Sequence, residues 1–218
     1  MHDHRHEFLR FALAAGALRF GAFTLKSGRH SPYFFDAGRF ASGARLARLG
    51  QFYAAAIDAA RIEFDLVFGP AYKGIPLAIG VAMALAARHD RDLPYAFDRK
   101  ETKDHGEGGR IVGAPLAGRV LIVDDVMTAG TSVDAAIATI RAAGAHPVGV
   151  AIMLDRAERA RDSEHSAADE VRARHGLPVI SIVGFDDLID FLAAEATPPA
   201  ATLAALRAYR KTYGVTNA

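Results

Sequence analysis

Two adjacent carboxylates end the most regular apolar run of the chain, Val120 to Val123. Asp124 and Asp125 follow that run directly, and a loop of small and hydroxyl-bearing residues, 128–132, comes soon after. Such a loop ahead of a helix suits a phosphate, because glycine lets the backbone approach, hydroxyls donate hydrogen bonds, and the free amides of a helix N-terminus point at the anion. The carboxylates would repel that phosphate. We therefore expect them to hold a neighbouring group that donates hydrogen bonds or carries positive charge, such as vicinal sugar hydroxyls or a metal.

Two further segments hold cations that an anion would need. Lys73 is the only charge in segment 68–76, a sharp turn bracketed by Gly69 and Gly74. Segment 99–110 places several cations among three glycines, which predicts a lid that closes over a polyanion. Each feature also has a structural alternative: a surface lysine, a solvated charged loop, and an acidic pair that merely ends a strand. Adjacent carboxylates ahead of a hydroxyl- and glycine-rich loop favour function.

The elements that must position these residues alternate along the chain. Continuous apolar strands that alternate with amphipathic helices indicate an α/β fold, with a mainly parallel sheet flanked by helices. Strands are expected at 64–68, 95–97, 120–123, 148–154 and 179–183, with helices at 75–88, 133–143 and 166–175. Ligands of such folds bind at the carboxyl ends of the strands, where the acidic pair and the Lys73 turn lie.

Further segments flank this core. Helices are expected at 7–17, 45–62, 187–194 and 201–213, and short strands at 20–25 and 33–36. No repeat or linker divides the sequence, so we expect one domain over 1–218. We expect it to comprise a small N-terminal hood of about 1–40, a core of about 45–185 and C-terminal helices of about 186–214. His2, His4 and His6 alternate in a way that could hold a metal ion, but we expect a frayed, solvated terminus instead.

The composition excludes several classes of site. The 218-residue chain has no cysteine, which excludes disulfides, thiolate catalysis and cysteine-ligated metals, and which suits a reducing compartment. Its net charge of +1 provides no global field toward nucleic acid or membranes. The N-terminus lacks an apolar signal core, and the apolar run 75–87 is too short to span a bilayer. A cytoplasmic protein is therefore expected.

The run Asp124 to Ser132 resembles the signature with which type I phosphoribosyltransferases bind 5-phosphoribosyl 1-diphosphate (PRPP). Segments 21–35, 64–76 and 99–106, together with Leu154-Asp155-Arg156, are similar to those of orotate phosphoribosyltransferases. The resemblance implies the type I phosphoribosyltransferase fold with a flexible catalytic loop. It also implies a reaction of orotate with PRPP that gives orotidine 5′-phosphate and diphosphate, in pyrimidine (UMP) biosynthesis. A homodimer with shared active sites and Mg²⁺ carried mainly by PRPP are further implications. Segment 159–168 and the C-terminal tail match less clearly.

The resemblance implies a role for each site residue. The acidic pair faces the ribose 2′- and 3′-hydroxyls, the loop after it holds the 5′-phosphate, and the cations favour the departing diphosphate. The implied catalytic residues are Lys103, Asp124, Asp125, Lys26 and His105, of which Lys103 has the largest effect and Lys26 serves the partner subunit's site. Those implied to bind PRPP are Lys26, Tyr72, Lys73, Arg99, Lys100, Lys103, His105, Asp124, Asp125, Val126, Met127, Thr128, Ala129, Gly130, Thr131 and Ser132.

Orotate is a planar ring with a carboxylate, so its pocket needs flat apolar contact and one fixed cation. By resemblance, Phe34, Phe35, Thr128 and Arg156 bind orotate, and Arg156 pairs with the carboxylate. A base without that carboxylate would then leave the charge of Arg156 unpaired. Adjacent aromatics on a strand, however, more often pack a core.

Three alternatives remain open. The nearest is a phosphoribosyltransferase that acts on uracil or a purine. A PRPP-sensing regulatory protein would need an added nucleic-acid-binding module, for which the near-neutral chain has no spare length. A dinucleotide-binding oxidoreductase would need a Gly-x-Gly-x-x-Gly run after a strand, which the sequence lacks. Diphosphate release with PRPP, magnesium and each base in turn discriminates between them.

Overall fold

The computed structural model describes residues 2–25, 27–103, 109–127, 130–160, 163–195 and 200–215, with the backbone alone for 2–3, 101–103 and 109. Its central sheet has the strand order β5-β4-β3-β6-β7-β8. The strands are β3 (Leu66–Gly69), β4 (Tyr95–Lys103), β5 (Gly109–Gly113), β6 (Arg119–Val123), β7 (His146–Asp155) and β8 (Val179–Gly184). Only β5 runs antiparallel to its neighbour within this described sheet. The expected mainly parallel α/β fold is confirmed.

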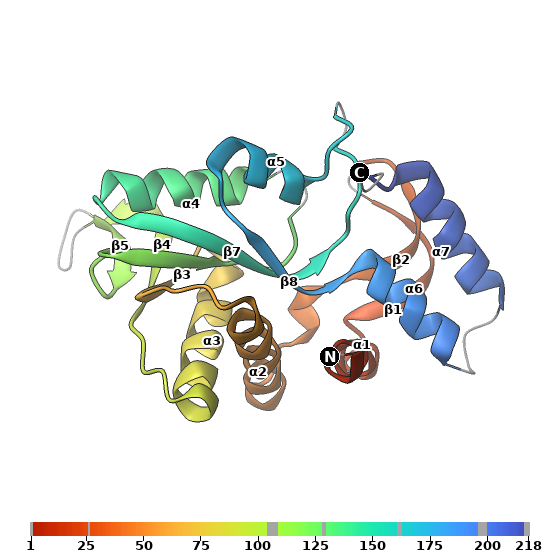
Figure 1. Cartoon of the computed structure of the whole chain (residues 1–218), viewed down its shortest axis with the longest axis horizontal. Helices are drawn as coiled ribbons and strands as arrows, with labels where there is room; N and C mark the ends of the chain where they lie inside the picture. Colours follow the sequence, from red (N-terminus) through yellow and green to blue (C-terminus); the bar gives the residue numbers. More distant parts are fainter. Residues whose placement is uncertain are drawn as a thin grey trace.

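Helices cover both faces of the sheet (Figure 1). α2 (Gly43–Ala60) and α3 (Gly74–His89) lie on one face, and α4 (Thr131–Ala142) and α5 (Ala167–His175) lie on the other. Because successive side chains of a strand point to opposite faces, β6 contributes to two cores. Leu121 and Val123 pack into the cluster that includes α2 and α3, and Val120 and Ile122 pack into the cluster that includes α4.

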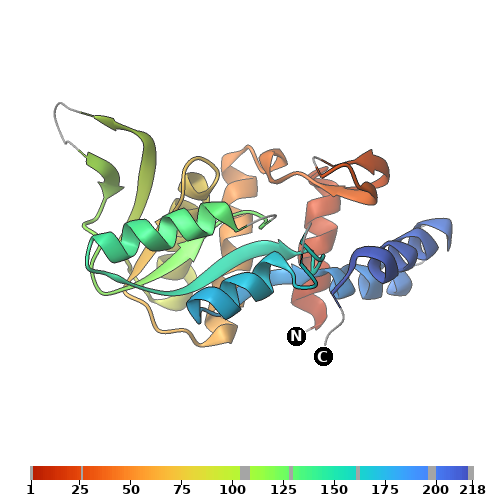
Figure 2. The same cartoon turned by 90° about the horizontal axis from the view of Figure 1, so that it is seen from above.

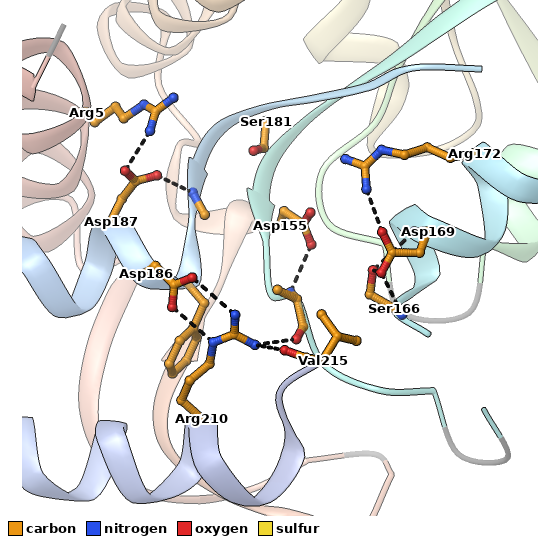
Figure 3. A pocket seen from close by; sticks show the side chains of 13 residues that line it. Arg5, Asp155, Ser166, Asp169, Arg172, Ser181, Asp186, Asp187, Arg210 and Val215 are labelled. Carbon is orange, nitrogen blue, oxygen red and sulfur yellow. Dashed lines mark hydrogen bonds and ion pairs between the residues drawn. The ribbon is translucent and has the colours of Figure 1, made fainter. Parts of the chain in front are cut away.

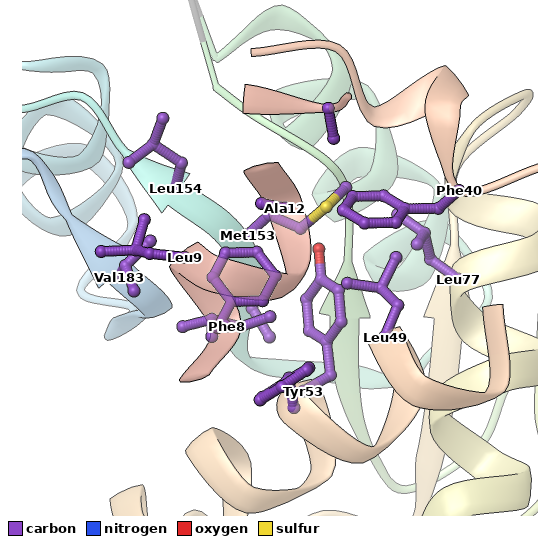
Figure 4. Close-up of a cluster of buried hydrophobic side chains, with 14 of the residues drawn as sticks. Phe8, Leu9, Ala12, Phe40, Leu49, Tyr53, Leu77, Met153, Leu154 and Val183 are labelled. Carbon is purple, nitrogen blue, oxygen red and sulfur yellow. The ribbon is translucent and has the colours of Figure 1, made fainter. Parts of the chain in front are cut away.

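The first of these cores joins the N-terminal helix to the sheet. α1 (His2–Ala14) contributes Phe8 and Leu9, which are buried together with Tyr53 of α2 and Leu154 of β7 (Figure 4). Burial of one such side chain contributes roughly 1.5–3 kcal/mol. The N-terminal segment is therefore an integral part of the fold.

The expectation of a frayed N-terminus is wrong. The helix begins at His2, and two of the alternating histidines pack onto aromatic side chains. The His4 ring lies 5.0 Å from that of Phe52, and the His6 ring lies 5.3 Å from that of Phe191. These contacts anchor the first turns of α1 to α2 and to the C-terminal part of the chain.

The remaining elements gather at one end of the molecule. β1 (Leu18–Thr24) and β2 (His30–Phe35) form a separate antiparallel sheet, followed by a short 3-10 helix (Ala37–Arg39). The terminal helices are α6 (Phe185–Ala194) and α7 (Ala200–Tyr213). Figure 2 shows the β4–β5 hairpin (green) at one end of the long axis and the C-terminal helices (blue) at the other, with the β1–β2 hairpin (red-orange) on their side of the molecule. Within the described residues, none of the helices has the length and apolarity that a membrane crossing requires.

Most element predictions are confirmed within a few residues, with one exception. The capping box at the start of α5 is present, because the Ser166 hydroxyl accepts from the Asp169 amide and the Asp169 carboxylate accepts from the Ser166 amide. The exception is segment 99–110. The structural alternative for this segment is a solvated loop, and that is wrong for its described residues, which form strands. β4 continues to Lys103, which pairs with Gly109 of β5, so backbone pairing makes a hairpin there. Residues 104–108 lie outside the described residues.

Candidate active site

The acidic pair lies where β6 ends, and its backbone stays bound to the sheet. The Asp124 amide donates to the Ala151 carbonyl at 3.0 Å, and the Met153 amide donates to the Asp125 carbonyl at 2.8 Å. From the opposite side, the buried Tyr53 hydroxyl donates to the Asp124 carbonyl at 2.6 Å. These bonds fix the direction in which the two carboxylates leave the backbone.

The Asp124 carboxylate is almost fully buried, with 8% of the residue exposed. It accepts from the Asp125 amide and from the Ser132 hydroxyl, both at 2.9 Å. Burial raises the pKa of Asp124, because desolvation disfavours the charged form, while the two hydrogen bonds act in the opposite direction. This carboxylate is thus held rigidly by its own loop.

The turn after β3 brings a cation to the acidic pair. A Cβ atom on Gly69 would lie 2.1 Å from the Gly74 carbonyl oxygen, so this close approach requires glycine. At the end of the turn, the Lys73 ammonium lies 2.6 Å from the Asp125 carboxylate. Its hydrogen bond with Asp125 raises the pKa of Lys73. The two strand ends predicted to share one site do meet.

The start of α4 lies beside the same carboxylates. Gly130 caps this helix in the left-handed conformation, with φ of 70°. No side chain of the described residues caps the helix, and the Ser132 hydroxyl turns to Asp124 instead. The amides of the first turn therefore remain available to an anion. Thr128 and Ala129, which belong to the predicted phosphate loop, lie outside the described residues.

The β4–β5 hairpin contacts the Lys73 turn. The Lys100 ammonium lies 4.8 Å from the centre of the Tyr72 ring, and the Asp98 carboxylate accepts from the Ala71 amide at 2.6 Å. Arg110 lies 3.9 Å from Asp98. The Arg110 side chain also donates to the carbonyl of another predicted cation, Arg99. Lys73 thus contacts the acidic pair directly, and Lys100 lies against the turn that carries Lys73. Lys26 and His105 lie outside the described residues, and Lys103 is described by its backbone only.

The adjacent phenylalanines of β2 have different surroundings. The Phe35 ring contacts the core, with centroids 6.3 Å from Phe8 and 6.5 Å from Phe40. The Phe34 ring lies 5.5 Å from that of Phe23, as expected for neighbouring residues that point to opposite faces of a strand. Their contact with a base stays a prediction.

Arg156 follows β7 directly, at the sheet edge where the neighbouring β6 ends in the acidic pair. Its guanidinium donates from Nε at 2.9 Å and from Nη2 at 2.7 Å to one carboxylate oxygen of Glu158. Burial opposes the charge, but Tyr33 and Glu158 more than offset it and hold the pKa of Arg156 above its ordinary range. The expectation that this charge is unpaired without a substrate carboxylate is wrong, because Glu158 already pairs with it.

Sequence reasoning missed two residues that position the site. Tyr53 was only one apolar position of a helix, although a buried tyrosine hydroxyl requires a partner. Glu158 lies two residues beyond the recognised Leu154-Asp155-Arg156 run, and nothing in its spacing indicated that it would turn back to Arg156. Both act through contacts that only the folded chain reveals.

A separate pocket lies between the ends of β7 and β8 and the C-terminal helix (Figure 3). Its three arginines each pair with an aspartate: Arg210 with Asp186 at 3.0 Å, Arg5 with Asp187 at 2.7 Å, and Arg172 with Asp169 at 2.8 Å. The remaining carboxylate, Asp155, accepts from the Ala157 amide at 2.9 Å, so the described lining leaves no arginine unpaired for an anion. Across the described ranges, no group of three or more histidine, cysteine or acidic residues could hold a metal ion.

Comparison with known proteins identifies the family. The model of the phosphoribosyl transferase domain matches residues 39–174. The chain is 60% identical over 215 residues to orotate phosphoribosyltransferase of Thioalkalivibrio sulfidiphilus, covering 99% of this chain and 100% of that protein. It is 63% identical over 198 residues to that of Xanthomonas euvesicatoria, covering 90% of each.

Among solved structures, the orotate phosphoribosyltransferase of Francisella tularensis superposes with a TM-score of 0.87 at 40% identity. The match covers 95% of this chain and 99% of that one. Sequence and fold agree. The chain belongs to the orotate phosphoribosyltransferase family.

Proposed function

We propose that this enzyme transfers the phosphoribosyl group of PRPP to orotate through the site at the carboxyl ends of β3, β6 and β7. A base nitrogen forms a bond to C1 of the ribose with inversion, while the bond from C1 to the diphosphate oxygen breaks. The products are orotidine 5′-phosphate and diphosphate. The observation that carries the proposal is the fixed acidic pair, with Lys73 on one side and the open N-terminus of α4 on the other.

Asp124 and Asp125 are suited to the ribose hydroxyls. A carboxylate accepts hydrogen bonds from vicinal hydroxyls, and each such bond to a charged group contributes roughly 1.5–3 kcal/mol. The amides of the first turn of α4, with the loop 128–132, would hold the 5′-phosphate. Val126 and Met127 connect these two parts of the PRPP site.

The cations neutralise the departing diphosphate while positive charge develops at C1. Lys73, Arg99 and Lys100 come from the described turn and hairpin, and Lys26, Lys103 and His105 are proposed from the family resemblance. Mg²⁺ would arrive with PRPP and keep substrate oxygens and water as ligands. This fits the described carboxylates, because Asp125 is paired with Lys73 and Asp124 with Ser132.

Orotate would lie between the aromatic strand β2 and the end of β7. We propose Phe34, Phe35 and Thr128 as its contacts, and Arg156 as the partner of its carboxylate. The proposal rests on the family resemblance and on the place of Arg156 at the same sheet edge as the acidic pair.

The test is to incubate the enzyme with PRPP, magnesium and each base in turn. Orotate should be consumed with release of diphosphate, while uracil, adenine and hypoxanthine are left unchanged. Equal turnover of uracil and orotate would rule out the proposed specificity.

We also propose a single-domain chain, with the predicted hood, core and C-terminal helices, that forms a cytoplasmic homodimer with shared sites. The β4–β5 hairpin would act as a lid that brings Lys103 and His105 over the partner's acidic pair. The test mixes a Lys103→Ala chain with a chain that carries both Asp124→Asn and Asp125→Asn, each of which is inactive alone. With random exchange about half of the dimers are mixed, and one of the two sites of each mixed dimer is intact. Roughly a quarter of wild-type activity should therefore return. Recovery near zero, with subunit exchange confirmed by mass, would contradict shared sites.

A further inference from the structure

The loop after β7 forms a compact network around Glu158. One carboxylate oxygen of Glu158 accepts from Arg156 and also, at 3.3 Å, from the Tyr33 hydroxyl. The other oxygen lies 3.4 Å from the Arg29 guanidinium. The Arg156 and Glu158 side chains are only 15% and 13% exposed. Arg156 also lies over the Tyr33 ring, at 5.1 Å from its centre. Contacts from three side chains thus converge on one carboxylate.

The backbone of this loop is bent to make the contact possible. Ala157, between Arg156 and Glu158, has φ of 47°, a left-handed conformation that costs energy in a residue with a Cβ atom. The Ala157 carbonyl accepts from the Val215 amide at 2.9 Å and from the Arg210 guanidinium at 3.2 Å (Figure 3). The C-terminal segment therefore holds the turn in the conformation that brings Glu158 back onto Arg156.

The contact with Glu158 uses only one side of the Arg156 guanidinium. Nε and Nη2 both donate to Glu158, and among the described residues no acceptor contacts Nη1. A guanidinium has five N–H donors in a planar fork, so the edge formed by Nη1 and the second hydrogen of Nη2 remains open. That edge has the geometry that a carboxylate accepts with two parallel hydrogen bonds.

We infer that Glu158 is a positioning residue for base recognition: it fixes Arg156 by its Nε side so that the open edge is aimed at the carboxylate of the base. The inference rests on the proposed role of Arg156. A fixed guanidinium loses little conformational freedom on binding, whereas a free one must be ordered by the substrate. Glu158 itself touches no substrate and acts only through Arg156.

The test compares Glu158→Ala with Glu158→Gln in steady-state kinetics. The alanine variant should raise KM for orotate about fivefold to tenfold, the cost of ordering one long side chain, while kcat and KM for PRPP change less than about twofold. The glutamine variant keeps an acceptor oxygen of the same shape and should restore most of the affinity. If Glu158 instead competed with the substrate for Arg156, both variants would lower KM for orotate, which would overturn the inference.

A matched control separates positioning from a general loss of stability. Glu195→Ala removes the same type of contact at an exposed site, where Arg10 donates from Nε at 3.0 Å and from Nη2 at 2.9 Å to one Glu195 oxygen. It should leave KM for orotate unchanged. If Glu158→Ala does not fold, Tyr33→Phe removes one anchor of Glu158 and should raise KM for orotate in the same direction.

Arg156→Ala distinguishes this inference from the proposed function. If it abolishes orotate affinity while Glu158→Ala and Tyr33→Phe change nothing, positioning by Glu158 is wrong and the role of Arg156 stands. If Arg156→Ala leaves KM for orotate unchanged, the proposed base site is wrong, and the inference is overturned with it.

Discussion

The ends of β6 and β7 are neighbours in the sheet, and each places a carboxylate against a cation, but the two ion pairs differ in construction. Asp125 pairs with Lys73 from a separate turn, and the lysine side chain is 62% exposed. Arg156 pairs with Glu158 from the same loop, and both side chains are largely buried. The first pair joins a long, exposed side chain to a largely buried carboxylate, whereas the second packs on the Tyr33 ring and lies in a turn that the C-terminal segment contacts.

This difference separates two ways of preparing a site for a charged ligand. An exposed lysine–carboxylate pair contributes little stability and can open when a stronger partner arrives. A buried arginine–carboxylate pair is costly to break, since either partner would remain buried without compensation. We therefore expect the β6 end to exchange partners when PRPP binds and the β7 end to keep its internal pair and use the remaining edge of Arg156.

The largest effect is expected from Asp124→Asn combined with Asp125→Asn. Loss of two charged hydrogen bonds to the ribose should lower kcat/KM for PRPP by about a hundredfold or more. The measurement is initial-rate kinetics at varied PRPP, with thermal melting to confirm the fold. Asp58→Asn, on an exposed surface of α2, is the control and should be nearly silent. A folded double variant with full activity would show that the acidic pair does not hold the ribose.

A smaller effect is expected from Lys73→Gln. Asp125 would lose its cation, and PRPP would lose one charge opposite its diphosphate, so KM for PRPP should rise by about tenfold. The rise should shrink at high salt, because screening weakens the contribution of an exposed charge. Lys211→Gln, in the last turn of α7, removes a charge of the same type far along the chain and serves as the control. An unchanged KM for PRPP would mean that Lys73 stays with Asp125 throughout.

The same contrast explains what the sequence could predict. The β6 end is a contiguous run, and its strand, acidic pair and glycine cap can be recognised from residue types alone. Lys73 was predictable as the single cation of a glycine-bracketed turn. The Arg156 network was not, because nothing in the spacing indicated that Glu158 would turn back to Arg156, and the left-handed Ala157 has no residue-type signal such as glycine. Strand β5 was also missed, since its pairing with β4 depends on backbone bonds across a charged segment.

A modest effect is expected from Ala157→Gly. Glycine adopts the left-handed conformation without the Cβ penalty, so the folded state loses strain, but the unfolded chain gains freedom. Stability should change by less than about 1 kcal/mol. KM for orotate should rise by no more than about threefold, the cost of a loosened turn around Arg156.

Gly176→Ala, at a left-handed position that ends α5 away from the site, is the reciprocal control: it should destabilise the fold and leave KM for orotate unchanged. A larger rise in KM for Ala157→Gly than for Glu158→Ala would show that the backbone turn, rather than the Glu158 contact, orients Arg156.

The smallest effect concerns the pH dependence of stability in Asp124→Asn. Burial raises the pKa of Asp124 in the folded state, so between its unfolded and folded pKa values the native protein binds more protons than the unfolded chain. The contribution of Asp124 to wild-type stability therefore falls as the pH rises through that window. Asparagine does not titrate, so the melting temperature of the variant relative to wild type should increase from about pH 4 toward neutrality.

Asp65→Asn is the control of opposite sign: hydrogen bonds from Arg119 lower the pKa of Asp65 to about 2, so its carboxylate stabilises the fold at neutral pH and loses this effect only in strong acid. Melting curves of the three proteins from pH 2 to 8 measure both differences, since Asp65 titrates only below about pH 4. A difference for Asp124→Asn that grows toward acid would mean that the hydrogen bonds from Asp125 and Ser132 outweigh burial, and that the acidic pair is held in its charged form without cost to the fold.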